Sequence, residues 1–143
     1  MREPSVDPFN LQRFVDAQAQ VIVDVLAELR DGRKRSHWMW FIFPQIAGLG
    51  SSPTAQHYAI SSRKEAEAYF EHPLLGPRLR QCTELVNQVP NRTIEEIFGY
   101  PDNLKFRSSM TLFANVAPSE HTFRAALDKY FSGQPDSATL ALL

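Results

Sequence analysis

The chain has 143 residues, a formal net charge of −1 and one cysteine. This length predicts a single compact domain over residues 1–143, with residues 1–6 and 134–143 peripheral. The balanced charge gives no strong signal for nucleic acid and argues against an acidic membrane surface. A lone Cys82 excludes an internal disulfide and a cysteine metal cage. With no signal or membrane-spanning pattern evident, we expect a cytoplasmic protein that holds no metal and no cofactor.

We expect an all-α fold of about six to eight short helices, packed as an irregular, orthogonal bundle. The first helix is predicted to have Asp7 as its cap and Pro8 as its first residue, and to stop at Gly32. Apolar residues recur along it at helical spacing, with Gln18 in the middle of the apolar face. A buried amide needs a hydrogen-bond partner, so Gln18 should meet a loop backbone, a water or a ligand.

A loop at residues 48–53 and a short helix through Ala55 and Tyr58 come next. Ser62 and Glu65 have the spacing of a capping box, which predicts the start of another helix. Pro73 begins the helix after that, and its Arg78 projects into the apolar arc. An arginine there either extends to the rim or reaches a buried anion.

The last third of the chain contains a second capping box, formed by Thr93 and Glu96. Asp102 or Asn103 is predicted to cap a longer helix through residue 115, and a further helix should start near Ser119. That helix stops at residue 133, and a short tail capped by an aspartate docks on the surface. The sequence contains no strand pattern of convincing length.

The most distinctive stretch is residues 33–45, where three cations and a Ser-His pair lead into the apolar run WMWFIF. Burying such a run is favourable by about 25 cal/mol per Å², so most of it should be covered. Trp38 and Trp40 are two positions apart, which is about 160° to 200° around a helix axis. One of the two tryptophans is therefore a candidate for the wall of a groove, beside a cation that would favour a flat ligand.

Residues 7–18, 32–50, 58–79 and 97–113 resemble the bacterial domain-of-unknown-function family numbered 1810. The two most specific pieces are SHWMWFIFPQ at residues 36–45 and KFRSSMTLF at residues 105–113. The resemblance implies a compact, mostly helical, cytosolic domain, and it transfers no activity. Some such proteins carry the name calpastatin, but no feature of this sequence supports a protease inhibitor.

Candidate site residues come from these two pieces and their surroundings. A neutral His37 could serve as a base or as a hydrogen-bond donor, and Asp102 is the carboxylate nearest to Lys105 in the sequence. His37 and Asp102 are therefore the candidate catalytic residues. The alternative for both is a purely structural role. Cations and hydroxyls suit phosphate or carboxylate. The predicted ligand-binding set is Arg35, Ser36, Trp38, Trp40, Gln45, Tyr58, Arg78, Lys105, Arg107, Ser108 and Ser109.

Two functions remain open. The first is a protein that binds, or a hydrolase that cleaves, a small nucleotide-like or anionic heterocyclic molecule in a pocket of aromatic, His and Lys side chains. The second is a non-catalytic helical interaction module in which residues 38–43 are buried core. An opening that contains His37, one tryptophan and Lys105 would favour the first, and a fully packed segment with its cations in water would favour the second.

Overall fold

The computed structural model describes residues 7–143 and confirms the predicted all-α class. These residues form nine helices and no strand, with one isolated bridge between Ile46 and Ile60. No helix among them has the length and hydropathy needed to cross a bilayer. The helices are α1 (Gln12–Arg30), α2 (Met39–Ile42), α3 (Pro53–His57), α4 (Arg63–Glu71), α5 (Leu75–Asn87), α6 (Ile94–Phe98), α7 (Asp102–Val116), α8 (His121–Phe131) and α9 (Ser137–Leu142).

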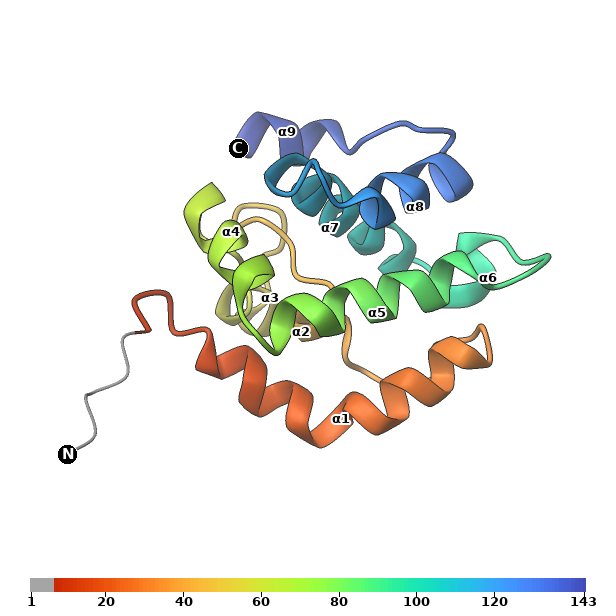
Figure 1. Ribbon diagram of the computed structural model, residues 1–143, viewed down its shortest axis with the longest axis horizontal. Helices are drawn as coiled ribbons and strands as arrows, with labels where there is room; N and C mark the ends of the chain where they lie inside the picture. The colour runs from red at the N-terminus through yellow and green to blue at the C-terminus, as the bar shows by residue number, and fades with distance from the viewer. Residues whose placement is uncertain (1–6) are drawn as a thin grey trace.

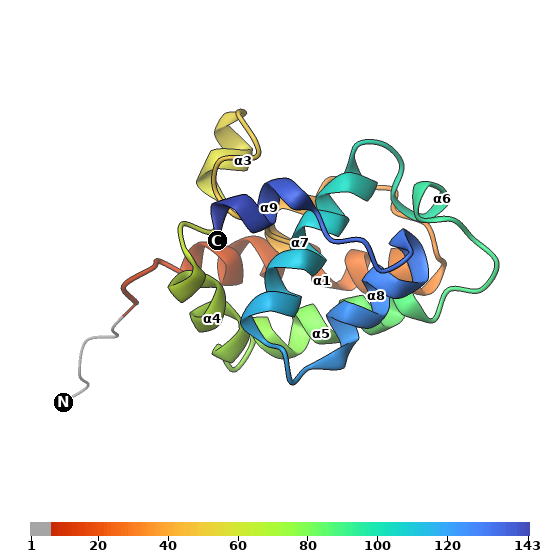
Figure 2. The ribbon, with the colours of Figure 1, turned by 90° about the horizontal axis from the view of Figure 1, so that it is seen from above.

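Helix α5 crosses the middle of the molecule, with α1 packed on one side and α8 on the other (Figure 1). Helix α7 packs against α4, α6, α8 and α9, and α9 lies along it near the C-terminus (Figure 2). The short α2 contacts both α1 and α7. The two distinctive sequence pieces therefore meet at the centre, where the ring of Phe43 stands edge-on to Phe106 with their centroids 5.0 Å apart.

The C-terminal residues form a short helix that packs on α7. Residues 1–6, predicted to be peripheral, lie outside the described residues. Residues 134–143 include α9, whose Thr139 is fully buried and whose capping residue Asp136 accepts a hydrogen bond from its backbone N–H at 3.0 Å. The backbone N–H of Asp136 in turn donates to Thr111 on α7 at 2.8 Å, so the predicted docking of a capped tail is confirmed.

The start of α1 differs from the prediction. The helix begins at Gln12, and Pro8 is not its first residue, because Asn10 has a left-handed φ of 52° that interrupts the chain between them. Asp7 still satisfies helix donors, since its carboxylate accepts hydrogen bonds from the backbone N–H groups of Leu11 and Gln12 at 2.8 and 3.0 Å.

The predicted end of α1 at Gly32 is confirmed. Gly32 has a φ of +72°, which favours glycine, and its N–H donates to the carbonyl of Leu29 at 3.0 Å. The next N–H, from Arg33, donates to the carbonyl of Glu28 at 3.0 Å. This pair of bonds is a Schellman motif, and it sets the direction in which the basic loop, residues 33–37, leaves the helix.

Capping chemistry was predicted well where it is local. Thr93 and Glu96 form a complete capping box at the start of α6. The hydroxyl of Ser62 accepts the N–H of Glu65 at 3.1 Å, but the carboxylate of Glu65 turns away to the backbone N–H and hydroxyl of Ser61. Only half of the capping box predicted for Ser62 and Glu65 therefore exists, because the Glu65 carboxylate has other partners.

The predicted cap of α7 is wrong. Helix α7 begins at Asp102 after Pro101 and has no side-chain cap, because the Asp102 carboxylate forms ion pairs with lysines. The amide of Asn103 donates instead to Glu95 at 3.2 Å. The helix predicted to start near Ser119 is α8, which begins at His121 and is capped by Glu120, whose carboxylate accepts the N–H of Thr122.

Gln18 found the partner that the sequence required. It is buried, and its amide donates to the backbone carbonyl of Phe41 at 2.8 Å and to the hydroxyl of Tyr69 at 3.0 Å. Burial raises the pKa of Tyr69, which keeps the hydroxyl neutral. Arg78 is half-buried, and among the described residues it pairs with no carboxylate; its guanidinium donates to Gln18 at 3.4 Å. These contacts tie α1, α2, α4 and α5 together.

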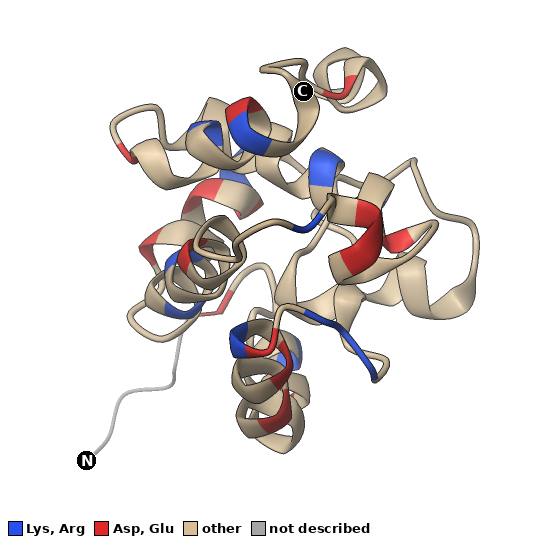
Figure 3. Ribbon diagram, turned by 90° about the vertical axis from the view of Figure 1, so that its right-hand side faces the viewer, with Lys and Arg blue, Asp and Glu red and all other residues tan. Residues whose placement is uncertain are grey.

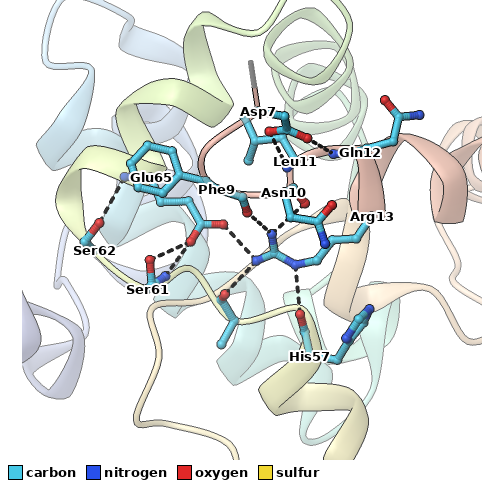
Figure 4. A network of polar contacts seen from close by, with 11 residues as sticks. Asp7, Phe9, Asn10, Leu11, Gln12, Arg13, His57, Ser61, Ser62 and Glu65 are labelled. Carbon is cyan, nitrogen blue, oxygen red and sulfur yellow. Dashed lines mark hydrogen bonds and ion pairs between the residues drawn. The ribbon is translucent and has the colours of Figure 1, made fainter. Parts of the chain in front are cut away.

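Arg13 fixes the other end of α1 (Figure 4). Its guanidinium pairs with the buried carboxylate of Glu65 at 2.8 Å, and the two side chains are 11% and 3% exposed. Its other N–H groups donate to four backbone carbonyls, those of Phe9, Asn10, His57 and Ala59, at 2.6 to 3.0 Å. All five guanidinium donors are therefore used, which makes Arg13 a structural clamp between α1, α3 and α4.

Arg13→Met should lower the free energy of unfolding by about 3 kcal/mol, because it leaves Glu65 buried without its cation. Urea unfolding at neutral pH measures this. Arg35→Met is the control, since Arg35 pairs with Asp31 at 3.0 Å but the two side chains are 55% and 60% exposed. That control should change stability by less than about 1 kcal/mol. Equal losses in both variants would contradict the clamp.

Candidate functional site

A cleft of about 440 Å³ lies where the loop before α3 faces α7 and the start of α9. It contains four of the predicted ligand-binding residues, Trp40, Gln45, Lys105 and Ser108. The remaining walls come from the loop, from α3, and from the beginnings of α7 and α9 with the residue before each: Leu49, Gly50, Ser51, Ser52, Ala55, Pro101, Leu104, Asp136 and Ala138. The two distinctive sequence pieces thus share one opening as well as one core.

The two tryptophans have separate positions. Trp38 is fully buried, and its indole N–H donates to Glu28 at 3.0 Å. Trp40 is half-buried and lines the cleft, with the ammonium of Lys105 5.0 Å from its ring centre. The single turn of α2 therefore directs one tryptophan into the core and the other toward solvent, where its face could stack on a flat molecule.

Glu28 holds the loop that carries both tryptophans. One of its oxygens accepts the backbone N–H groups of Arg35 and Ser36 at 2.6 and 3.0 Å, and the other accepts the Ser36 hydroxyl at 2.6 Å. Burial acts to raise the pKa of Glu28, but these hydrogen bonds and the one from Trp38 outweigh it and hold the pKa below its usual 4.5. Glu28 is thus a buried, ionised anchor for the basic loop.

The basic loop runs past α6 at the end of the molecule seen in Figure 3. The backbone N–H of Lys34 donates to the carbonyl of Ile97 on α6 at 2.7 Å. Arg35 and Ser36 are fixed by Glu28, and neither lines the cleft. His37 is exposed and likewise is not among the residues that line it. The structure therefore separates His37 from Lys105, the pair expected at one opening.

Asp102 lies behind the cleft wall and contacts two lysines. Its carboxylate is 2.9 Å from the ammonium of Lys34 and 3.3 Å from that of Lys105. Lys34 also lies 5.1 Å from the ring centre of Trp38. A continuous line of charges and rings thus joins the buried tryptophan to the cleft tryptophan.

The serines and arginine of the second piece have different environments. The hydroxyl of Ser108 lines the cleft and donates to Asp136 at 3.2 Å, and Asp136 also accepts two hydrogen bonds from Thr139. Ser109 is buried, and its hydroxyl has no hydrogen-bond partner among the described residues. Arg107 points away, donating to the carbonyl of Gln134 at 3.0 Å.

Tyr58 and Gln45 extend the site inward. Both line a narrow space of about 10 Å³ behind Trp40. Gly50 closes this space tightly, because a Cβ there would lie 2.6 Å from the Cβ of Ala55. Arg78, on α5, lies with Gln18 and Tyr69 rather than in the cleft.

Residues 8–143 match the family model described as protein of unknown function, DUF1810. The chain belongs to the DUF1810 family. A DUF1810 relative of known structure, the conserved hypothetical protein Rv1873 from Mycobacterium tuberculosis, is 62% identical, with a TM-score of 0.95 over 96% of this chain and 98% of that one. No functionally curated protein matches the chain.

Three important residues of the DUF1810 cleft and its support were not singled out from the sequence. Glu28 acts on residues seven to ten positions away, a separation with no local pattern. Lys34 was grouped with its exposed neighbours, although its side chain is only 8% exposed. Asp136 was expected only as a cap, and its place in the cleft wall depends on how α9 docks. The sequence feature that could have indicated these residues is the junction of cations and aromatic residues at residues 33–45.

Glu28→Gln should lower the free energy of unfolding at pH 7 by about 2 kcal/mol, because it weakens hydrogen bonds to a charged acceptor. The difference from wild type should shrink as the pH falls. A lowered folded pKa contributes stability that is complete above the unfolded value of 4.5 and is lost as the pH drops through the folded value. Unfolding by urea from pH 7 down to about pH 3 measures this.

The matched control is Asp24→Asn, which changes an exposed carboxylate on the same helix. Its stability should follow the wild-type curve across the same pH range. A Glu28→Gln difference that stays constant between the two pH limits would contradict an ionised anchor.

Proposed function

We propose that this DUF1810 protein binds, in the cleft, a small molecule that combines a flat ring with an anionic group. The observation that carries the proposal is the half-buried ring of Trp40 with the Lys105 ammonium 5.0 Å from its centre. These groups come from residues 65 positions apart and meet only at this wall. The ammonium lies over the ring, and an aromatic ring paired with a cation suits a nucleotide-like or other anionic heterocyclic ligand.

The size and lining of the cleft support a small ligand. Its volume of about 440 Å³ falls within the roughly 300 to 1,000 Å³ that is usual for small-molecule sites. Apolar surface comes from Leu49, Pro101 and Leu104, around the face of Trp40. Such a site can cover a ring, while a few polar groups orient it.

The charged lining supports an anionic substituent. Lys105 is the only cation among the described residues that line the cleft, and its side chain is 26% exposed. The one lining carboxylate, Asp136, already accepts hydrogen bonds from Ser108 and from Thr139. Gln45 and Ser51 add polar atoms to the lining. Lys105 contacts one carboxylate, Asp102, and its ammonium has three N–H donors, so it can also bind an anionic group in the cleft.

The proposal is one of binding, without a bond-breaking step. Asp102 is held between two lysines, and the exposed His37 is not a cleft residue, so neither is positioned to transfer a proton to a molecule against Trp40. The alternative, an interaction module, is favoured by the burial of Trp38, Met39, Ile42 and Phe43. It leaves the half-exposed Trp40 and its cation without a role.

Binding can be read from tryptophan fluorescence, because Trp40 is the tryptophan at the cleft. AMP, UMP and nicotinate, three anions with flat rings, are the probes, and ribose 5-phosphate is the anion without one. At least one ring anion should quench Trp40 and raise the melting temperature, since ligand at 100 times Kd stabilises a fold by about 2.7 kcal/mol. Trp40→Leu should weaken that binding by about tenfold, the loss of one stacking contact.

Lys105→Met should weaken binding of the same probe by a similar factor, because it removes the cation beside the ring. Lys64→Met is its matched control, an exposed lysine on α4 outside the cleft, and should bind as wild type does. The proposal fails if no ring anion changes fluorescence or melting temperature. Equal binding by wild type, Trp40→Leu and Lys105→Met would place the ligand elsewhere.

A further inference from the structure

One carboxylate behind the cleft is shared by two ammonium groups. Asp102 Oδ2 lies 2.9 Å from Lys34 Nζ, and Asp102 Oδ1 lies 3.3 Å from Lys105 Nζ. Lys105 stands three residues after Asp102 on α7, whereas Lys34 arrives from the basic loop after α1. The shorter contact is the one made by the residue that is distant in sequence.

The two lysines differ in how firmly they are held. The side chain of Lys34 is 8% exposed and lies against the ring of Trp38, and its backbone N–H is bound to Ile97. The side chain of Lys105 is 26% exposed and lies at the cleft. A buried ammonium needs its carboxylate more than a partly solvated one does, so Asp102 belongs chiefly to Lys34.

We infer that Lys34 is a specificity-determining residue that gives the cleft its preference for anions while lying outside it. Within this group of three, two cations share one carboxylate, so one positive charge is not neutralised by Asp102, and the geometry leaves it on Lys105, in the cleft lining that also contains Asp136. Without Lys34, Asp102 would pair fully with Lys105, and the wall beside Trp40 would lose its positive charge, with the carboxylate of Asp136 still in the lining. This inference rests on the proposed function for its biological use, but the local charge can be measured without any ligand.

Collisional quenching of tryptophan fluorescence measures that charge directly. Trp38 is fully buried and Trp40 is half-buried, so quenchers in solution reach the ring of Trp40 rather than that of Trp38. Iodide reports the local positive potential, and neutral acrylamide reports access alone. Lys34→Met should lower the Stern–Volmer constant for iodide by about twofold, with that for acrylamide unchanged. Lys34→Arg, which keeps the charge, should restore the wild-type iodide value.

Asp102→Asn should act in the opposite direction. It removes the shared anion, so iodide quenching of Trp40 should rise by about twofold, while the melting temperature falls because Lys34 loses its partner. A merely structural role for the ion pairs would not produce a variant that is less stable yet more attractive to anions. Arg35→Met, which removes an exposed cation from the same loop, is the control and should change iodide quenching less than Lys34→Met does.

The same variants separate this inference from the proposed function. If a wild-type protein binds AMP, Lys34→Met should weaken AMP binding by about threefold and leave adenosine, the same ring without the phosphate, unaffected. Unchanged iodide quenching in both Lys34→Met and Asp102→Asn would overturn the role of Lys34, whatever binds. Altered iodide quenching with no binding of any ring anion would uphold the charge arrangement and overturn the proposed ligand.

Discussion

The structure depends on one buried carboxylate, that of Glu28, which organises a loop that has no regular structure of its own. It accepts two backbone N–H groups, a serine hydroxyl and the indole of Trp38. Backbone N–H groups in a partly buried loop destabilise the fold if they have no hydrogen-bond acceptor. The Glu28 carboxylate supplies the acceptors that backbone carbonyls would provide in a helix or sheet. The direction of the chain into α2, and with it the positions of both tryptophans, follows from this anchor.

The features of the fold that could be predicted from the sequence are those set by neighbours in the chain. Helical periodicity, the Thr93 capping box and the stop at Gly32 all act over a few residues, and each was confirmed. The errors arose where a distant partner competed. Asp102 does not cap α7 because its carboxylate forms ion pairs with Lys34 and Lys105. Glu65 does not complete its capping box because its carboxylate binds Arg13 and Ser61 instead.

The candidate site follows the same division. Trp40 could be singled out because the sequence shows an aromatic run beside cations. Lys105 could be singled out because the helical spacing places it at the edge of an apolar helix face. Which tryptophan faces the cleft could not be predicted, since α2 is a single turn and its orientation is set by Glu28 and by Gln18, which binds the carbonyl of Phe41. His37, one residue from Trp38, consequently points to solvent.

The short segment around α2 therefore contributes one face to the core and the other to the cleft. This arrangement couples the stability of the fold to the proposed ligand binding in the cleft. The packing of Trp38 and Phe43 fixes α2 against α1 and α7, and the same turn presents Trp40 to the opening. Lys34 takes part in both, because it lies on the ring of Trp38 while holding the carboxylate beside Lys105. A cleft wall built in this way is held by the core, since the packing of Trp38 and Phe43 fixes α2 while Lys105 stands on the long helix α7. The junction of cations and aromatics in the sequence is thus the place where the charge of the cleft is tied to the packing of the fold.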